Sequence, residues 1–183
     1  MKKVAVLLAE GFEEIEALTV VDVLRRANIQ CDMVSINKKD VIGAHNIKVS
    51  ADILIDEVKD IDMVVLPGGM PGATNLRDNK KVIKLIQELI KDNKKVGAIC
   101  AAPIVLAKAG VIEGEDITSY PGFEEELKGA NYKEDAVVVS GNIITSRGPA
   151  TALEFAYTIV KELNPTKEID VRDGMLYYMI KSK

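Results

Sequence analysis

Cys100 is the residue whose surroundings most clearly suggest chemistry, because it lies where a strand pattern turns into a helix pattern. The segment KKVGAICAAPIVLAKAG starts as an apolar strand, reaches Cys100, and continues through small residues and Pro103 into a helical pattern. Ligands of open α/β sheets gather at the carboxyl ends of strands, and the N–H groups at a helix N-terminus favour a thiolate. We therefore predict that Cys100 is a nucleophile. The alternative is a small buried thiol that only packs.

The second cysteine, Cys31, offers no comparable argument. It lies inside the strand-like segment CDMVSI, where a small apolar side chain is expected to pack in the core. Two cysteines in a chain of 183 residues do not make a disulfide scaffold. We expect two thiols and assign chemistry only to Cys100.

A pair of glycines, Gly68 and Gly69, follows another predicted strand in VVLPGGMPGATN. Glycine lets backbone N–H groups approach a ligand closely, so we predict that the N–H groups of Gly69 and Ala101 stabilise an oxyanion beside Cys100. The alternative is a tight turn that needs positive φ. Neither a Walker phosphate loop nor Gly-x-Gly-x-x-Gly is present.

Three glutamates, Glu13, Glu14 and Glu16, open the first predicted helix. For Glu13 and Glu14 we expect only a favourable interaction with the helix dipole. Glu16 is flanked by apolar residues, and a desolvated carboxyl tends to stay protonated. We predict that Glu16 contacts Cys100 and donates a hydrogen bond to its thiolate.

The single histidine, His45, lies in a turn-rich segment without cysteine or carboxylate neighbours at metal-ligand spacing. One histidine does not build a zinc site, so no metal is predicted and His45 is expected at the surface.

The elements that must position these residues alternate between strands and helices. Nearly continuous apolar runs at 4–9, 62–66 and 96–99 predict buried parallel strands, with helices between them. Turn formers predict a small hairpin between residues 35 and 52, and a second hairpin in DAVVVSGNIITSRG before a helix over 150–163. We predict a doubly wound three-layer α/β/α sandwich, mostly parallel, with a small edge hairpin and a last helix after Pro165.

Length and composition favour one domain over residues 1–183. The net charge of −4 and the absence of tryptophan argue against nucleic acid as a partner. No apolar run approaches the roughly 20 residues that span a bilayer, and the first apolar run is too short for a signal peptide. The expected location is the cytoplasm, with no membrane partner.

Four ordered segments, EGFEEIEALTVVDVLRRANI, LPGGMPGATNL, AICAAPIVLAKAG and ITSRGPATALEFA, closely resemble the ThiJ/PfpI superfamily, in the branch of the parkinsonism-associated protein deglycase and its bacterial relatives. The resemblance covers almost the whole chain. It implies a flavodoxin-like, class I glutamine amidotransferase-like domain that forms a homodimer and uses no cofactor. The site residues that it implies are catalytic Cys100 and Glu16, oxyanion or substrate-binding Gly68, Gly69, Ala101 and His45, and Arg147 and Pro149 in a loop or dimer contact.

One residue departs from the resemblance: Tyr120 stands in SYPG, where some members have a histidine near the cysteine. This makes a Cys–His–acid triad, and with it peptidase or amidase activity, the weakest hypothesis. The first hypothesis is a stress-response enzyme that acts on reactive dicarbonyls or glycated groups, as a glyoxalase or deglycase does. The second is oxidation sensing or a chaperone role, with Cys100 as a peroxide-sensitive thiol.

Overall fold

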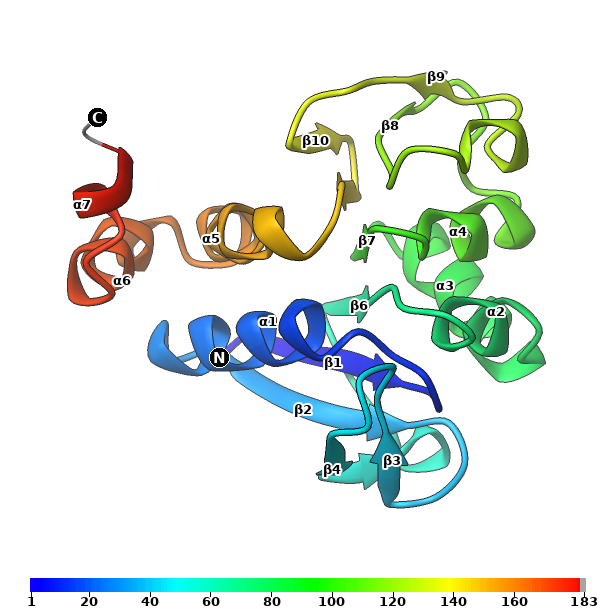
Figure 1. Cartoon of the computed structure of the whole chain (residues 1–183), viewed down its shortest axis with the longest axis horizontal. Coiled ribbons are helices and arrows are strands. Elements are labelled where there is room, and N and C mark those ends of the chain that lie inside the picture. Colours follow the sequence, from blue (N-terminus) through cyan, green and yellow to red (C-terminus); the bar gives the residue numbers. More distant parts are fainter. Residues whose placement is uncertain (182–183) are drawn as a thin grey trace.

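The computed structural model describes residues 1–181, and its centre is a mostly parallel sheet (Figure 1). The strand order is β10-β11-β7-β6-β1-β2-β5, and every neighbouring pair is parallel except β10 and β11. The strands are β1 (Lys3–Leu8), β2 (Gln30–Ser35), β5 (Ile53–Leu54), β6 (Met63–Leu66), β7 (Lys95–Ile99), β10 (Val137–Ser140) and β11 (Ile143–Ser146). The predicted apolar strands form the middle of this sheet, where both faces are covered.

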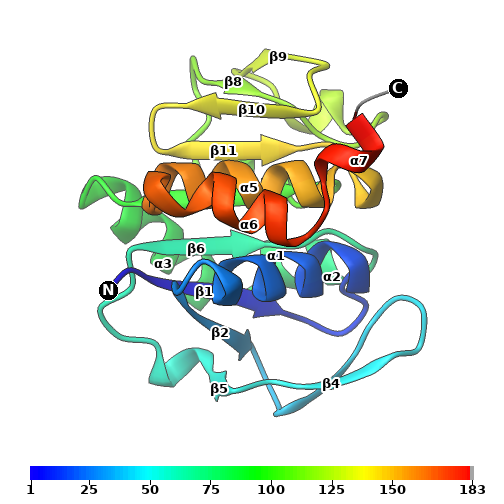
Figure 2. The same cartoon turned by 90° about the vertical axis from the view of Figure 1, so that its left-hand side faces the viewer.

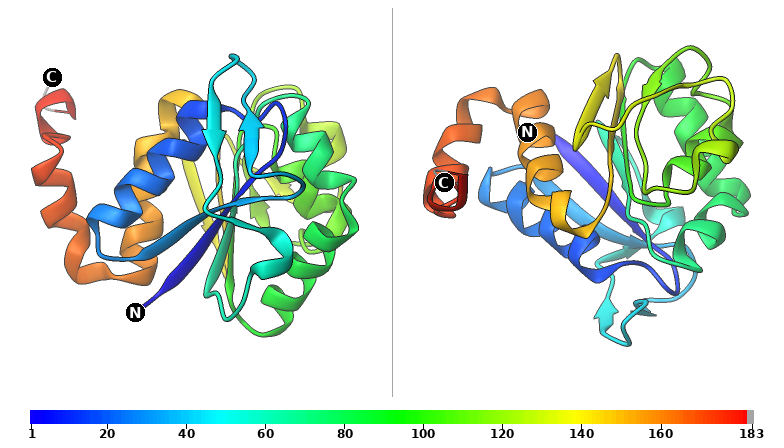
Figure 3. Two further views of the ribbon diagram at one scale, coloured as in Figure 1. Left: turned by 90° about the horizontal axis from the view of Figure 1, so that it is seen from below. Right: turned by 45° about the horizontal axis from the view of Figure 1, so that its top comes forward.

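Helices cover both faces of the sheet (Figure 1 and Figure 3). On one face lie α1 (Glu14–Arg26) and α5 (Ala152–Leu163), with α6 (Glu168–Gly174) and α7 (Tyr178–Lys181) outside them (Figure 2). On the other lie α2 (Gly72–Arg77), α3 (Lys80–Lys91) and α4 (Pro103–Ala109). The predicted three-layer sandwich is confirmed.

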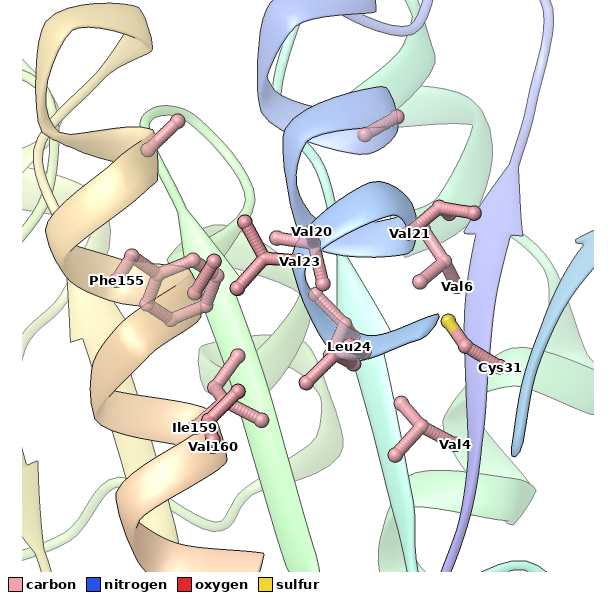
Figure 4. Close-up of a cluster of buried hydrophobic side chains, with 14 of the residues drawn as sticks. Val4, Val6, Val20, Val21, Val23, Leu24, Cys31, Phe155, Ile159 and Val160 are labelled. Carbon is pink, nitrogen blue, oxygen red and sulfur yellow. The ribbon is translucent and has the colours of Figure 1, made fainter. Parts of the chain in front are cut away.

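The core between the sheet and the α1–α5 pair is mostly aliphatic, with aromatic side chains such as Phe155 among them (Figure 4). Cys31 points from β2 into this core beside Val4, Val6 and Val21, and only 3% of it is exposed. Burial raises the pKa of the Cys31 thiol to about 12. The prediction that Cys31 packs in the core is confirmed.

Both predicted hairpins are present. The first joins β3 (Asp40–Ile42) and β4 (Lys48–Ser50) in a separate antiparallel sheet, and the second is β10–β11. The sequence patterns missed α2, β5, β8 (Asp116–Ile117) and β9 (Asn131–Tyr132), because elements this short show too little periodicity. The tail after Pro165 forms the two short helices α6 and α7 in place of one.

Within residues 1–181, none of the helices has the length and apolar character needed to cross a membrane.

Candidate active site

Cys100 directly follows β7 and has φ of +64°, a left-handed conformation that is uncommon outside glycine. Two backbone hydrogen bonds fix Cys100 in this conformation. Its N–H donates to the carbonyl of Ser146 at 3.0 Å, and its carbonyl accepts the N–H of Tyr120 at 2.9 Å. Strained residues of this kind cluster at functional sites, where the surrounding structure fixes them. The side chain is partly exposed at the carboxyl edge of the sheet.

The first turn of α1 brings Glu16 to this thiol. The Glu16 side chain is fully buried, its Oε2 accepts the N–H of Gly68 at 2.8 Å, and its carboxyl is in hydrogen-bonding contact with Cys100. The other oxygen, Oε1, is buried and accepts no N–H from the described residues. Burial raises the pKa of Glu16 to about 7, although the bonds from Gly68 and Cys100 lower it. A carboxyl that ionises near neutrality can both hold and release a proton.

Gly68 is the spacer that lets these two groups meet. A Cβ added at this position would lie 2.7 Å from the Cβ of Cys100 and 2.8 Å from Oε2 of Glu16. The resemblance implied that the Gly68 N–H serves an oxyanion. That expectation is wrong for this conformation, because the same N–H is already bonded to Glu16. Gly68 therefore positions the carboxyl.

The N–H groups of Ala101 and Gly69 do point at the sulfur, and each lowers the pKa of the Cys100 thiol. Burial acts against them, and so does the negative charge of Glu16, which together raise this pKa to about 12. The helix-end N–H groups therefore do not outweigh burial and the Glu16 charge, and a thiolate also needs the protonated Glu16 that we predict. The two groups are coupled, because a proton on Glu16 removes the charge that opposes ionisation of the thiol.

Glu13 and Glu14 are buried, and each makes specific hydrogen bonds beyond the expected interaction with the helix dipole. Glu13 caps α1 by accepting the N–H of Glu16 at 2.8 Å. Glu14 accepts the backbone N–H of His45 at 2.8 Å and contacts its Nδ1 at 2.9 Å, which raises the pKa of His45. The expectation that His45 lacks carboxylate neighbours is wrong, because the β3–β4 hairpin folds back onto α1. A long-range contact of this kind leaves no signal in residue spacing.

Arg147 and Pro149 lie in the segment after β11, and Tyr120 is hydrogen-bonded to Cys100 through its backbone N–H. Arg147 follows β11, directly after the residue that accepts the Cys100 N–H, and its Nη1 is buried without a hydrogen-bond partner among residues 1–181. Pro149 opens a 3-10 turn over Pro149–Thr151. Tyr120 is half-exposed, and its ring lies 3.3 Å from where a Cβ of Gly148 would be.

The fold and this geometry define a class of protein: a parallel α/β sandwich with a cysteine at a strand-to-helix elbow and a buried carboxyl against it. The DJ-1/PfpI family matches residues 2–162, and the chain belongs to this family.

Individual relatives agree with this assignment. The chain is 38% identical to Protein dj-1beta of Drosophila melanogaster, over 96% of this chain and 97% of that protein. The crystal structure of Drosophila melanogaster DJ-1beta superimposes with a TM-score of 0.93 at 39% identity, covering 96% of this chain and 97% of that one. Glutathione-independent glyoxalase DJR-1.2 of Caenorhabditis elegans is 34% identical, over 84% of each chain. Protein DJ-1 homolog A of Arabidopsis thaliana is 38% identical over 87% of this chain, but the chain spans only 42% of that longer relative.

Proposed function

We propose that this protein is a cofactor-free enzyme that converts reactive dicarbonyls, or groups glycated by them, to hydroxy acids, with Cys100 as nucleophile and Glu16 as proton carrier. The contact between these two side chains is the observation that carries the proposal. The N–H groups of Gly69 and Ala101 beside the sulfur supply a place for an oxyanion. The glyoxalase name of the Caenorhabditis elegans relative supports the same reaction class.

The proposed reaction is balanced without an external oxidant. Sγ of Cys100 attacks the aldehyde carbon of methylglyoxal and forms the C–S bond of a hemithioacetal. Glu16 removes the proton from this carbon and returns a proton to the neighbouring ketone carbon, so the first carbon is oxidised and the second is reduced. Water then hydrolyses the resulting lactate thioester, which breaks the C–S bond and restores the thiol. The sum is methylglyoxal plus water giving lactate.

The test is lactate formation from methylglyoxal by the purified, chelator-treated protein. We expect turnover by the parent and by Cys31→Ser, whose thiol is buried in the core, and loss of at least about 100-fold in Cys100→Ser. Removing a nucleophile typically costs far more than this. Equal rates for the parent and Cys100→Ser would overturn the proposal.

A second candidate function is oxidation sensing, and the difference between the two thiols favours it. Cys100 is partly exposed and next to two N–H donors, whereas Cys31 is buried among aliphatic groups. A sulfinic acid at Cys100 could accept a hydrogen bond from protonated Glu16, and an oxidised form could act as a holdase chaperone. Mass spectrometry after graded peroxide is expected to show Cys100 oxidised well before Cys31. Equal sensitivity would remove this candidate. Peptidase activity gains no support, since the one histidine is bonded to Glu14.

We also propose that the protein is a homodimer, as the family resemblance implies, with Arg147 and Pro149 near the contact. The protein offers apolar surface for a second copy at exposed Ile15 on α1 and at Ile42 and Ile47 on the adjoining hairpin. Light scattering after size exclusion is expected to give twice the mass of the 19.9 kDa chain. A single-chain mass at micromolar concentration would contradict it.

A further inference from the structure

We infer that Glu13, Glu14 and His45 form a binding site for one divalent transition-metal ion such as Zn²⁺, at a position next to the cysteine site. Each of the three residues offers one ligand atom, and these atoms all lie within 4.8 Å of one another. Nδ1 of His45 is 2.9 Å from Oε2 of Glu14 and 3.9 Å from Oε1 of Glu13. One imidazole and two carboxylates are a ligand set that Zn²⁺ commonly takes, with water in the fourth position.

The distances need only a small adjustment to fit an ion. In a tetrahedral site with bonds of about 2.0–2.2 Å, ligand atoms are about 3.3–3.6 Å apart. The contact between His45 and Glu14 would lengthen and the one between His45 and Glu13 would shorten. His45 can make this adjustment because its side chain is 69% exposed, whereas those of Glu13 and Glu14 are only 9% and 5% exposed and are fixed.

The carboxylates are arranged as metal ligands usually are, with one oxygen of each held by backbone N–H groups. Oε2 of Glu13 accepts the N–H of Glu16, and Oε1 of Glu14 accepts those of His45 and Ile47. This leaves one oxygen of each glutamate on the side of Nδ1. Gly43 makes the arrangement possible, since a Cβ there would lie 2.3 Å from Oε1 of Glu14.

A proton on Nδ1 of His45 can be shared with only one of the two glutamates, whereas a metal ion would contact both. Nδ1 carries one proton, and at 2.9 Å it serves Glu14. Oε1 of Glu13 has no hydrogen bond within the described part of the chain, and its only charged contact is His45 at 3.9 Å, although its side chain is nine-tenths buried. This oxygen is not fully enclosed, so an ion can reach it. A divalent ion would contact both oxygens and match the two carboxylate charges.

The test is Zn²⁺ binding to the full-length, chelator-treated protein, measured by competition with a chromophoric chelator. Cys100→Ser serves as the parent, so that the catalytic thiol cannot supply a ligand and the outcome does not depend on the proposed enzyme activity. We expect one Zn²⁺ per chain, with binding weakened at least tenfold in His45→Ala and in Glu13→Gln. Glu134→Gln, at an exposed glutamate away from the cluster, is the matched control and should bind as the parent does.

Circular dichroism and thermal melting establish that each variant is folded. If Glu13→Gln fails to fold, His45→Ala still decides the matter, because that side chain is exposed and its removal leaves the helix cap in place. Co²⁺ titration gives an independent readout, with a visible absorption band expected in the parent and not in His45→Ala. Zn²⁺ affinity that is unchanged in His45→Ala, or a parent that binds no Zn²⁺ at 100 µM, would overturn the inference.

Discussion

Replacing Glu16 by glutamine should make the Cys100 thiol more reactive while abolishing turnover. The thiol pKa is raised by burial and by the Glu16 charge, and glutamine removes the charge at nearly constant shape. Its amide oxygen can still accept the N–H of Gly68, and its NH₂ can donate to the sulfur. More of the thiol should then be ionised at a given pH, but the group that moves the proton is gone.

The size of the expected change in the Cys100 pKa follows from the contact between Glu16 and Cys100. Two unit charges about 4 Å apart repel by about 4 kcal/mol at an effective dielectric constant of about 20, which equals about 3 pKa units. Solvent at the partly exposed sulfur reduces this value, so we expect the thiol pKa to fall by about 1–3 units. Because Glu16 has a pKa of about 7, the difference should be large above pH 7 and should shrink below it, where the parent carboxyl is protonated as well.

The assay is the rate of alkylation of Cys100 by iodoacetamide between pH 5 and pH 10, in a Cys31→Ser background with chelator present. Lactate formation is measured on the same samples. Glu134→Gln controls for the loss of a distant charge. A Glu16→Gln protein with the parent's alkylation profile would refute the electrostatic coupling, and one with the parent's turnover would refute the role of Glu16 as proton carrier.

Three further outcomes are expected. Gly68→Ala should lower kcat/KM for methylglyoxal at least tenfold with an unchanged circular dichroism spectrum, because its Cβ would displace Glu16 from Cys100; full activity would contradict the spacer role. In urea titrations, the free energy of unfolding of Glu16→Gln should exceed that of the parent by about 2–3 kcal/mol at pH 8, and by less at pH 5. The reason is that a buried acid with a raised pKa contributes stability below its unfolded pKa and loses it as the pH rises through about 7. Arg172→Met should lower the free energy of unfolding by about 3 kcal/mol in the same titration. The Arg172 guanidinium pairs with Glu154 and Glu168 and stacks on Tyr157 and Tyr177. A loss below about 1 kcal/mol would count against a stabilising role for these contacts.

The sequence predicts the sheet and the position of Cys100 because these depend on local patterns. Apolar runs identify β1, β6 and β7, and the change from a strand pattern to a helix pattern marks the elbow. The state of the thiol could not be predicted in this way. It depends on the ionisation of Glu16, which reaches Cys100 from 84 positions earlier in the chain. The burial of Glu14 likewise depends on how the β3–β4 hairpin folds over α1.

The first turn of α1 links the two sites, because its side chains leave the helix in different directions. Successive residues of a helix are rotated by about 100°, so Glu14 faces the hairpin, Ile15 faces outward with 55% of its surface exposed, and Glu16 faces the sheet and Cys100. Glu13, at the N-cap of α1, contacts residues on both sides. Its Oε2 accepts the Glu16 N–H, and its Oε1 faces His45. The ion site and the thiol site therefore share one helix turn but no ligand atom. For this reason Cys100→Ser should remove catalysis and leave metal binding intact, whereas His45→Ala should weaken metal binding in the Cys100→Ser protein as well.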